Sequence, residues 1–127
     1  MIKKVIFTEN APTPIGPYSQ AILKGDTLYT SGQIAIDPST GELIIDTIVK
    51  ETERVMLNMK AVLEAADMSF ENVVKTSIFV ADMNDFAAIN QVYGSFFNEK
   101  TAPARETVQV ACLPKNVNVE ISMIAVL

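Results

Sequence analysis

The alternation of apolar and polar residues along the chain predicts two amphipathic helices among short strands. Apolar residues recur three or four apart over 46–66 and again over 85–97, which is the spacing of one helix face. Runs rich in β-branched and aromatic residues predict strands at 3–8, 18–23, 27–31, 73–80, 106–113 and 117–127. The expected order of elements is therefore β-β-β-α-β-α-β-β.

Turn-forming residues separate these elements. Lys24-Gly25-Asp26 predicts a β-hairpin, because glycine adopts the positive φ that a tight turn requires. Three of the six prolines lie within 10–17, which predicts an ordered but irregular loop. Either Asp46 or Thr47 is expected to cap the first helix.

The helices and strands together predict a two-layer α+β domain with a mixed sheet. Each helix has one apolar stripe, so both helices are expected to pack on the same face of the sheet. A chain of 127 residues has an ordinary size for one domain, and residues 1–127 are expected to form a single domain. The other face of the sheet is then left uncovered.

Side-chain alternation in the last two strands predicts what the uncovered face carries. In the final strand the expected core set is Val117, Val119, Ile121, Met123 and Ala125, and the opposite set is Asn118, Glu120, Ser122, Ile124 and Val126. In the strand before it, the residues expected to face the helices are Val108, Val110 and Cys112, with Cys112 a small core residue. The residues expected to share the uncovered face with Glu120 are Arg105, Thr107, Gln109 and Ala111. A face that mixes apolar and polar side chains is typical of a subunit interface.

Composition excludes several classes of chemistry. The chain has no histidine, which rules out a Ser-His-Asp or Cys-His nucleophile and a two-histidine metal site. Its single cysteine cannot form an internal disulfide or a structural zinc site, in agreement with a reducing cytosol. A net charge of −5 and a pI near 4.6 disfavour binding to a nucleic-acid backbone. No apolar run approaches the roughly 20 residues of a membrane helix, so a soluble, cytoplasmic protein without a membrane partner is expected.

Arg105 and Glu120 are the residues with the clearest chemical interpretations. Arg105 starts a strand in a chain with only two arginines; it is either a surface arginine paired with a carboxylate or a guanidinium needed for bidentate hydrogen bonding. Glu120 interrupts a very apolar strand, where it either protects a solvated edge or, if another subunit covers the face, serves as a proton shuttle. Tyr18, Ser31 and Asn90 are polar residues at element ends that spacing alone does not single out.

Six short motifs follow one another between Phe7 and the C-terminus. They are Gly16-Pro17-Tyr18-Ser19-Gln20-Ala21, Ser31-Gly32-Gln33, Val74-Lys75-Thr76 with Phe79-Val80, Pro103-Ala104-Arg105, Leu113-Pro114, and Val119-Glu120-Ile121 with Ile124-Ala125. In this order they resemble the motifs of the YjgF/RidA family of reactive enamine and imine deaminases, and the match is best to the RidA subgroup. The resemblance covers nearly the whole chain.

The resemblance implies a chorismate-mutase-like α+β fold. It also implies a homotrimer whose sheets form an inner barrel, with a site in each cleft between subunits. The implied activity is hydrolysis of 2-iminobutanoate and 2-iminopropanoate, products of pyridoxal-phosphate-dependent dehydratases, to 2-oxo acids and ammonia. The implied ligands are these small 2-imino and 2-oxo acids, and neither a metal nor an organic cofactor is implied.

The resemblance also assigns roles by position. Arg105 matches the carboxylate-binding arginine of the family and Glu120 its acidic residue near the catalytic water, which makes these two the expected catalytic residues. Tyr18, Ser31 and Asn90 match residues that line the cleft and bind substrate.

One position departs from the common pattern. Thr107 stands where many RidA members have a cysteine two residues after the arginine. The resemblance implies that backbone groups hold the substrate at this position, and a threonine backbone supplies the same groups. A role for a thiol there is not expected in this chain.

Other functions stay open at the level of sequence. The same cleft could belong to a non-catalytic protein that binds 2-oxo acids or other short carboxylic acids. RNA cleavage, a further activity within the family, is disfavoured by the acidic pI and the absence of histidine. A holdase-type chaperone activity is not decided by the sequence.

Overall fold

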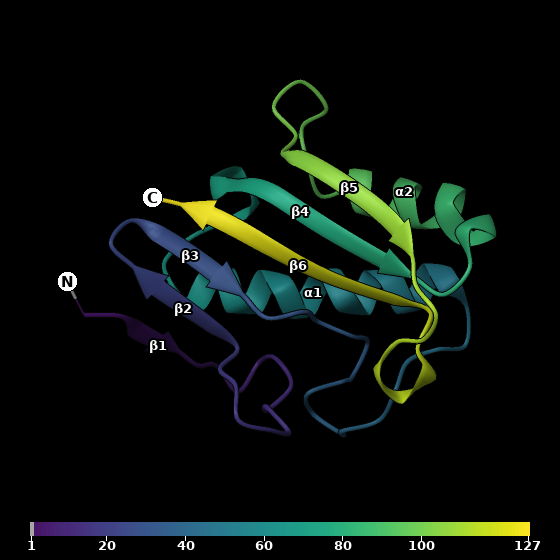
Figure 1. Cartoon of the computed structure of the whole chain (residues 1–127), viewed down its shortest axis with the longest axis horizontal. Helices are drawn as coiled ribbons and strands as arrows, with labels where there is room; N and C mark the ends of the chain where they lie inside the picture. Colours follow the sequence, from purple (N-terminus) through teal and green to yellow (C-terminus); the bar gives the residue numbers. More distant parts are fainter. Residues whose placement is uncertain (1) are drawn as a thin grey trace.

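The computed structural model describes residues 2–127, and their elements follow the predicted order along the chain (Figure 1). The strands are β1 (Lys4–Ile6), β2 (Ala21–Lys24), β3 (Thr27–Thr30), β4 (Val73–Val80), β5 (Ala104–Gln109) and β6 (Val119–Val126). The helices are α1 (Ile48–Ala65) and α2 (Phe86–Gly94). Short 3-10 helices occupy Phe70–Asn72, Met83–Asp85 and Pro114–Asn116. The β-β-β-α-β-α-β-β prediction is confirmed.

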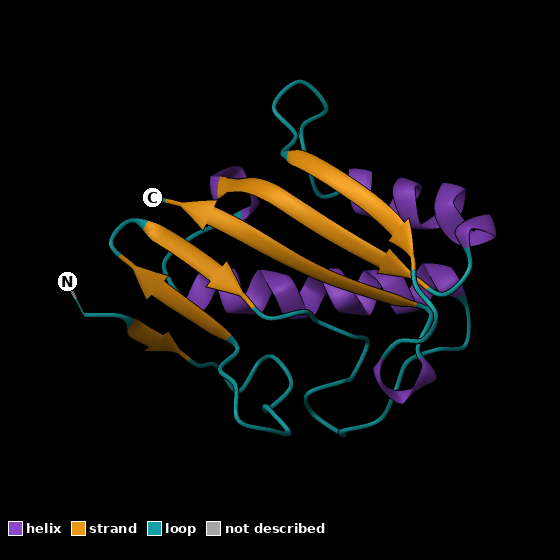
Figure 2. Cartoon of the chain, in the orientation of Figure 1, coloured by secondary structure: helices purple, strands orange, loops and turns teal. Residues whose placement is uncertain are grey.

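The strands form one six-stranded mixed sheet (Figure 2). Its spatial order is β1-β2-β3-β6-β4-β5, and every neighbouring pair is antiparallel except β4 and β5, which are parallel. The C-terminal strand β6 therefore lies in the middle of the sheet, and β5 lies at its edge. A parallel pair needs a crossover connection, which α2 provides between β4 and β5.

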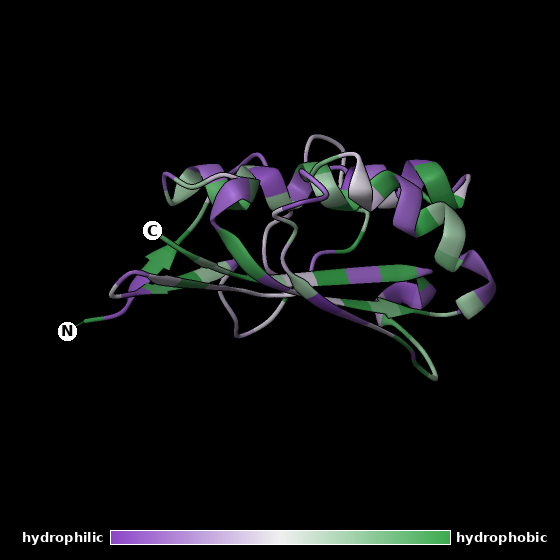
Figure 3. Ribbon diagram, turned by 90° about the horizontal axis from the view of Figure 1, so that it is seen from above, coloured by the Kyte–Doolittle hydropathy of each residue, from purple (hydrophilic) through white to green (hydrophobic). Residues whose placement is uncertain are grey.

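Both helices lie on the same side of the sheet (Figure 3), as the two-layer prediction requires. Thr47, one of the two expected caps, begins α1, and its hydroxyl accepts the Lys50 amide at 3.1 Å. The apolar stripe of α1 is fully buried: Val55, Met56, Met59, Val62 and Leu63 have no exposed surface. This stripe packs over the core residues of the sheet, so the α+β fold class is confirmed.

The predicted alternation in the last strand is confirmed. Along β6, the side chains of Val119, Ile121, Met123 and Ala125 are buried under the helices. Those between them, Glu120, Ser122 and Ile124, are only partly buried and lie on the uncovered face.

The faces predicted for β5 are wrong and must be exchanged. β5 pairs with β4 and not with β6, and in the parallel register Arg105 lies opposite Thr76, a fully buried core residue. Thr107 and Gln109 follow on the same helix-facing side, opposite Ile78 and Val80. Glu106 lies on the uncovered face instead, where its carboxylate forms an ion pair with Lys75 at 2.7 Å and accepts the Ser77 hydroxyl.

The predicted burial of Cys112 is also wrong. β5 ends at Gln109 because its partner β4 ends at Val80, and the last bond along this edge joins the Val110 amide to the Val80 carbonyl at 2.9 Å. Cys112 therefore lies beyond the strand and is exposed. Its Sγ contacts the Asn116 Oδ1 at 3.1 Å.

Helix α2 is shorter than predicted, ending at Gly94 instead of residue 97. The three following amides bond to carbonyls three residues back, which is 3-10 geometry, so the chain tightens into a turn.

Within residues 2–127, no helix is long and apolar enough to span a membrane. The cytoplasmic location stays a prediction.

A buried glutamate ties α1 to the start of β6. Glu51 has no exposed surface, and its carboxylate accepts three hydrogen bonds. They come from the Asn118 amide at 2.7 Å, the Asn118 side-chain Nδ2 at 2.7 Å and the Val119 amide at 3.1 Å. The carboxylate thus satisfies the backbone where β6 enters the sheet, directly before Glu120.

Replacing Glu51 should lower the free energy of unfolding. Glu51→Leu leaves these three donors without partners, and each buried unsatisfied donor costs about 1–3 kcal/mol, so we expect a loss of at least about 3 kcal/mol in urea unfolding. Glu64→Leu, at an exposed position of the same helix, is the control and should change stability by less than about 0.5 kcal/mol. Equal effects of the two changes would show that Glu51 does not anchor β6.

Candidate functional site

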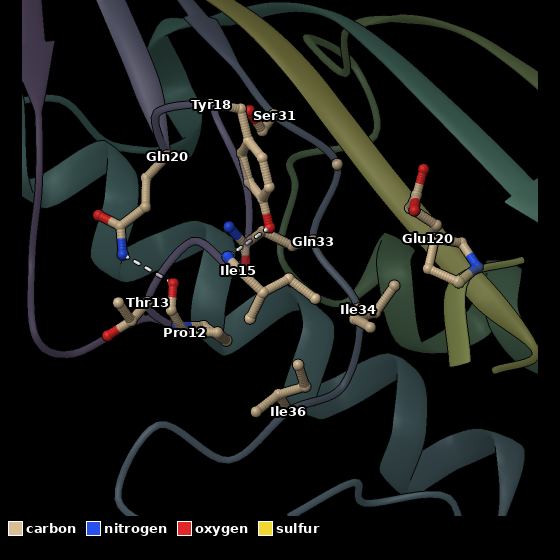
Figure 4. A pocket seen from close by; sticks show the side chains of 12 residues that line it. Pro12, Thr13, Ile15, Tyr18, Gln20, Ser31, Gln33, Ile34, Ile36 and Glu120 are labelled. Carbon is tan, nitrogen blue, oxygen red and sulfur yellow. Dashed lines mark hydrogen bonds between the residues drawn. The ribbon is translucent and has the colours of Figure 1, made fainter. Parts of the chain in front are cut away.

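A pocket of about 390 Å³ opens between the proline-rich loop that joins β1 to β2 (residues 7–20) and the segment that follows β3 (Figure 4). The loop contributes Ile15 and Tyr18, and residues 31–36 form the facing wall. Glu120 reaches the pocket from β6. The pocket thus combines a few polar groups with an apolar surface, as small-molecule sites commonly do.

Backbone contacts orient two hydroxyl groups of the pocket, those of Tyr18 and Ser31. The Tyr18 hydroxyl accepts the Ile15 amide at 3.4 Å, so its own hydrogen is free for a ligand. The Ser31 hydroxyl donates to the Ser19 carbonyl at 2.6 Å, which leaves its lone pairs free to accept. These two hydroxyl groups therefore offer one donor and one acceptor at fixed places.

Glu120 is the acidic group of this pocket. Its side chain is half-buried, and this desolvation raises its pKa above the ordinary value of a glutamate. Within residues 2–127 no lysine or arginine lies at ion-pair distance from it. A carboxyl group with a raised pKa and no cationic partner holds a proton more readily than an ordinary glutamate, which suits a group that takes up and releases a proton.

Gly32 makes room for the Glu120 carboxyl group. A Cβ atom at position 32 would lie 2.7 Å from both the carboxyl carbon and Oε2 of Glu120. Any larger residue would push the Glu120 side chain out of its place. Position 32 therefore requires a glycine because the Glu120 side chain approaches it closely, and not because of the backbone conformation of Gly32.

Arg105 lies at the opposite face of the sheet, against α2. Its guanidinium carbon is 5.1 Å from the Tyr93 ring centroid and 5.6 Å from that of Phe86. Burial raises the pKa of Tyr93, whose hydroxyl donates to the Thr76 Oγ1 at 2.9 Å and thereby holds the ring. No carboxylate within residues 2–127 forms an ion pair with Arg105. The guanidinium is held by aromatic rings and keeps its donors available for an anion.

Asn90 and Thr107 belong to the Arg105 region. Asn90 lies one helical turn after Phe86 on α2 and is exposed. Thr107 follows Arg105 on the same side of β5, and its Oγ1 is buried without a hydrogen-bond partner in the described chain. A buried hydroxyl without a partner is unusual and fits a place where another group completes the structure.

One chain does not bring all the predicted site residues together. Tyr18, Ser31 and Glu120 share the pocket, whereas Arg105 lies on the other face of the sheet, on an edge strand separated from β6 by β4. The expectation that Arg105 and Glu120 share one face is therefore wrong. We name the pocket that contains Tyr18, Ser31 and Glu120 the acid pocket. The group around the guanidinium is named the arginine patch, and its members are Arg105, Phe86, Tyr93, Asn90 and Thr107.

Reasoning from the sequence missed Gly32, Phe86 and Tyr93 as site residues. The two aromatic residues carry a local signal, since they lie on the same apolar stripe of the predicted second helix. Gly32 has no such signal apart from its place in Ser31-Gly32-Gln33, because its role depends on the position of β6.

Within residues 2–127, no cluster of three or more acidic, cysteine or histidine side chains is arranged to hold a metal ion.

Comparisons with known proteins agree with this fold. The family model described as Endoribonuclease L-PSP matches residues 8–127. A RutC family protein of Pyrococcus horikoshii is 53% identical over 124 residues, which cover 98% of this chain and 98% of the relative. The 2-iminobutanoate/2-iminopropanoate deaminase of Mus musculus is 47% identical over 126 residues, 99% of this chain and 93% of the relative. The crystal structure of E. coli TdcF with bound serine superimposes with a TM-score of 0.92 at 45% identity, covering 98% of each chain.

A mixed sheet covered on one face by two helices, with a small pocket beside its central strand, defines an α+β protein. The chain belongs to the Endoribonuclease L-PSP family, which is the YjgF/RidA family that its motifs resemble.

The raised pKa of Glu120 should appear in the pH dependence of stability. The folded protein keeps the Glu120 proton at pH values where the unfolded chain has already lost it, so the contribution of Glu120 to the free energy of unfolding falls as pH rises between these two pKa values. Glu120→Gln does not titrate. The unfolding free energy of the unchanged protein minus that of Glu120→Gln should therefore decrease with rising pH and then level off.

Urea unfolding at fixed protein concentration across the acidic to neutral pH range measures this difference. Glu64→Gln, on the exposed side of α1, is measured in parallel as the control for replacing a glutamate by a glutamine. A difference for Glu120→Gln that is flat or rises with pH would contradict the assignment.

Proposed function

We propose that this protein hydrolyses small 2-imino acids, such as 2-iminobutanoate and 2-iminopropanoate, to 2-oxo acids and ammonia. The observation that carries the proposal is the state of Arg105. Its guanidinium is stacked on two aromatic rings and lacks a carboxylate partner in the described chain, which is the arrangement that an incoming carboxylate needs. The names of the mouse relative and of a Homo sapiens relative, 45% identical over 126 residues, point to the same reaction.

The proposed site is composite, since a short imino acid cannot reach both the arginine patch and the acid pocket of one chain. We propose a homotrimer in which the arginine patch of one subunit meets the acid pocket of the next. The uncovered sheet face supports an assembly, because a row of apolar side chains crosses it. Val5 pairs with Ile22, Ile22 with Tyr29, and Tyr29 with Ile124. Such a surface is typical of contacts between subunits.

The proposed mechanism uses each group for a task its position allows. Arg105 binds both carboxylate oxygens and orients the substrate. Water attacks C2 of the protonated imine while Glu120 accepts a proton from the water, which gives a carbinolamine. Glu120 then returns the proton to the nitrogen, the C–N bond breaks, and the carbonyl forms as its hydroxyl proton passes to the departing ammonia, which leaves as ammonium. The free hydrogen of the Tyr18 hydroxyl and the lone pairs of Ser31 are placed to bind the reacting groups.

Replacing Arg105 tests the carboxylate site. Arg105→Ala should lose the acceleration of imine hydrolysis, and Arg105→Lys should recover little of it, because an ammonium lacks the paired donors of guanidinium. A threonine dehydratase generates 2-iminobutanoate in the assay, and release of 2-oxobutanoate is followed with and without the protein. Arg54→Ala is not a suitable control, since Arg54 bonds to the buried Asn58; Lys100→Ala, in an exposed loop, is used instead. Near-normal activity of Arg105→Ala would overturn the proposal.

Mixing two inactive variants tests the composite site. Arg105→Ala and Glu120→Gln chains are unfolded together in equal amounts and refolded, so that mixed trimers form. A site regains both groups when the chain that supplies Arg105 carries Glu120→Gln and its neighbour carries Arg105→Ala, which random assembly gives in about a quarter of sites. About a quarter of normal activity is therefore expected, whereas no recovery would contradict a site shared between subunits.

A second candidate is a non-catalytic protein that binds small carboxylic or amino acids. The observation in its favour is the solved structure of TdcF, which contains bound serine. Saturable binding of 2-oxobutanoate without any acceleration of imine hydrolysis would favour this candidate over the deaminase.

A further inference from the structure

Two buried side-chain amides hold the walls of the acid pocket, and the proposed mechanism uses neither. Gln20 itself lines the pocket, whereas Asn58 lies behind its wall. Gln20 precedes β2 and is 1% exposed, and Asn58 lies on α1 and is fully buried. Each amide bonds to backbone groups of a pocket wall that has no regular secondary structure. The irregular walls thus obtain from side chains the hydrogen bonds that a helix or sheet would supply.

Gln20 holds the wall formed by the proline-rich loop. Its Nε2 donates to the carbonyls of Thr8 at 3.0 Å, Ala11 at 3.3 Å and Pro12 at 3.0 Å, and its Oε1 accepts the Thr8 amide at 2.8 Å. The bond to Pro12 is visible beside the pocket in Figure 4. The loop continues from Pro12 to Ile15, whose side chain lines the pocket.

Asn58 holds the facing wall. Its Nδ2 donates to the carbonyls of Ile34 at 3.1 Å and Ile36 at 2.9 Å. Its Oδ1 accepts the Arg54 Nε at 3.1 Å. Because arginine only donates, this bond fixes the orientation of the amide and points both of its hydrogens at the wall. The side chains of Ile34 and Ile36 line the pocket opposite Ile15.

We propose that Gln20 and Asn58 are positioning residues that fix the separation of these two apolar walls, and so set the largest substrate side chain that the pocket accepts. The proposal rests on the proposed function and concerns the same pocket. A short substrate side chain leaves the walls untouched, whereas a branched chain of four carbons contacts them. Loss of either amide should therefore affect long substrates selectively.

Isosteric variants replace the donors by carboxylate oxygens with little change in side-chain shape. Gln20→Glu and Asn58→Asp keep the oxygen that accepts the Thr8 amide or the Arg54 Nε, but their carboxylates repel the wall carbonyls. The Arg54 bond of Asn58→Asp becomes charge-assisted, which favours a folded protein. Asn72→Asp is the control for the chemical change, because Asn72 donates from Nδ2 to a backbone carbonyl, that of Val126 at 3.0 Å, at a partly exposed position that does not line the pocket.

Steady-state kinetics with a small and a large substrate provide the first measurement. An amino-acid oxidase with catalase generates the small imine from 2-aminobutanoate and the large imine from leucine. In Gln20→Glu and Asn58→Asp, we expect the Michaelis constant for the large imine to rise at least about tenfold. The Michaelis constant for the small imine, and kcat for both, should change less than about threefold. An equal loss for both substrates, or no change for either, would overturn the proposal.

Hydrogen exchange provides a second measurement that does not depend on activity. In the folded variants, amides within 8–13 should exchange faster in Gln20→Glu and amides within 34–36 faster in Asn58→Asp, with the control unchanged. Binding of 4-methyl-2-oxopentanoate should weaken relative to that of 2-oxobutanoate.

If the unchanged protein hydrolyses neither imine, the proposed function fails, and exchange and binding alone decide the positioning role. Should the charged variants not fold, Gln20→Ala and Asn58→Ala are measured in the same way, and unchanged exchange in them overturns the proposal.

Discussion

The parallel pairing of β5 with β4 determines where the charged groups of the candidate site lie. In this register Arg105 is opposite Thr76 and faces the helices, while Glu106 faces the other side. Antiparallel pairing of β5 with β6 would have allowed a short hairpin, but parallel pairing requires a crossover. That crossover is α2, and its Phe86 and Tyr93 are the rings on which the guanidinium rests. The connection that the topology demands therefore also supplies the platform for the arginine.

Three of the buried polar side chains in this molecule have a common task. Glu51 accepts the backbone amides at the start of β6, Gln20 bonds to the proline-rich loop, and Asn58 bonds to the segment after β3. Each of the three side chains forms hydrogen bonds with backbone groups that have no partner in the regular pattern of the sheet. A polar group in the core is tolerated because its bonds are satisfied, and here those bonds connect the core to the segments around the pocket.

Local periodicity predicted much of this fold, and non-local pairing accounts for what it missed. β4 was predicted with its observed bounds and the faces of β6 were assigned correctly, because alternation within a strand depends only on that strand. The faces of β5 were reversed because they depend on which strand lies beside it. Of the site, Tyr18, Ser31 and Glu120 were predicted from the family motifs and share one pocket. The space left by Gly32 for Glu120 could not be predicted, since it exists only between segments far apart in the chain.

The support of the pocket walls by buried amides also affects how the sequence of this protein can diverge. Ile15 is 72% exposed, and Ile34 and Ile36 are partly exposed, so none of the three side chains belongs to the central core. Asn58 bonds to the backbone carbonyls of Ile34 and Ile36. Gln20 bonds to the loop that leads to Ile15, as far as Pro12. Substitution of the isoleucines changes the shape of the cavity at little cost to folding, whereas substitution of the amides behind them alters the walls themselves. Natural selection can therefore adjust the range of ligands at one set of positions while a second set preserves the scaffold.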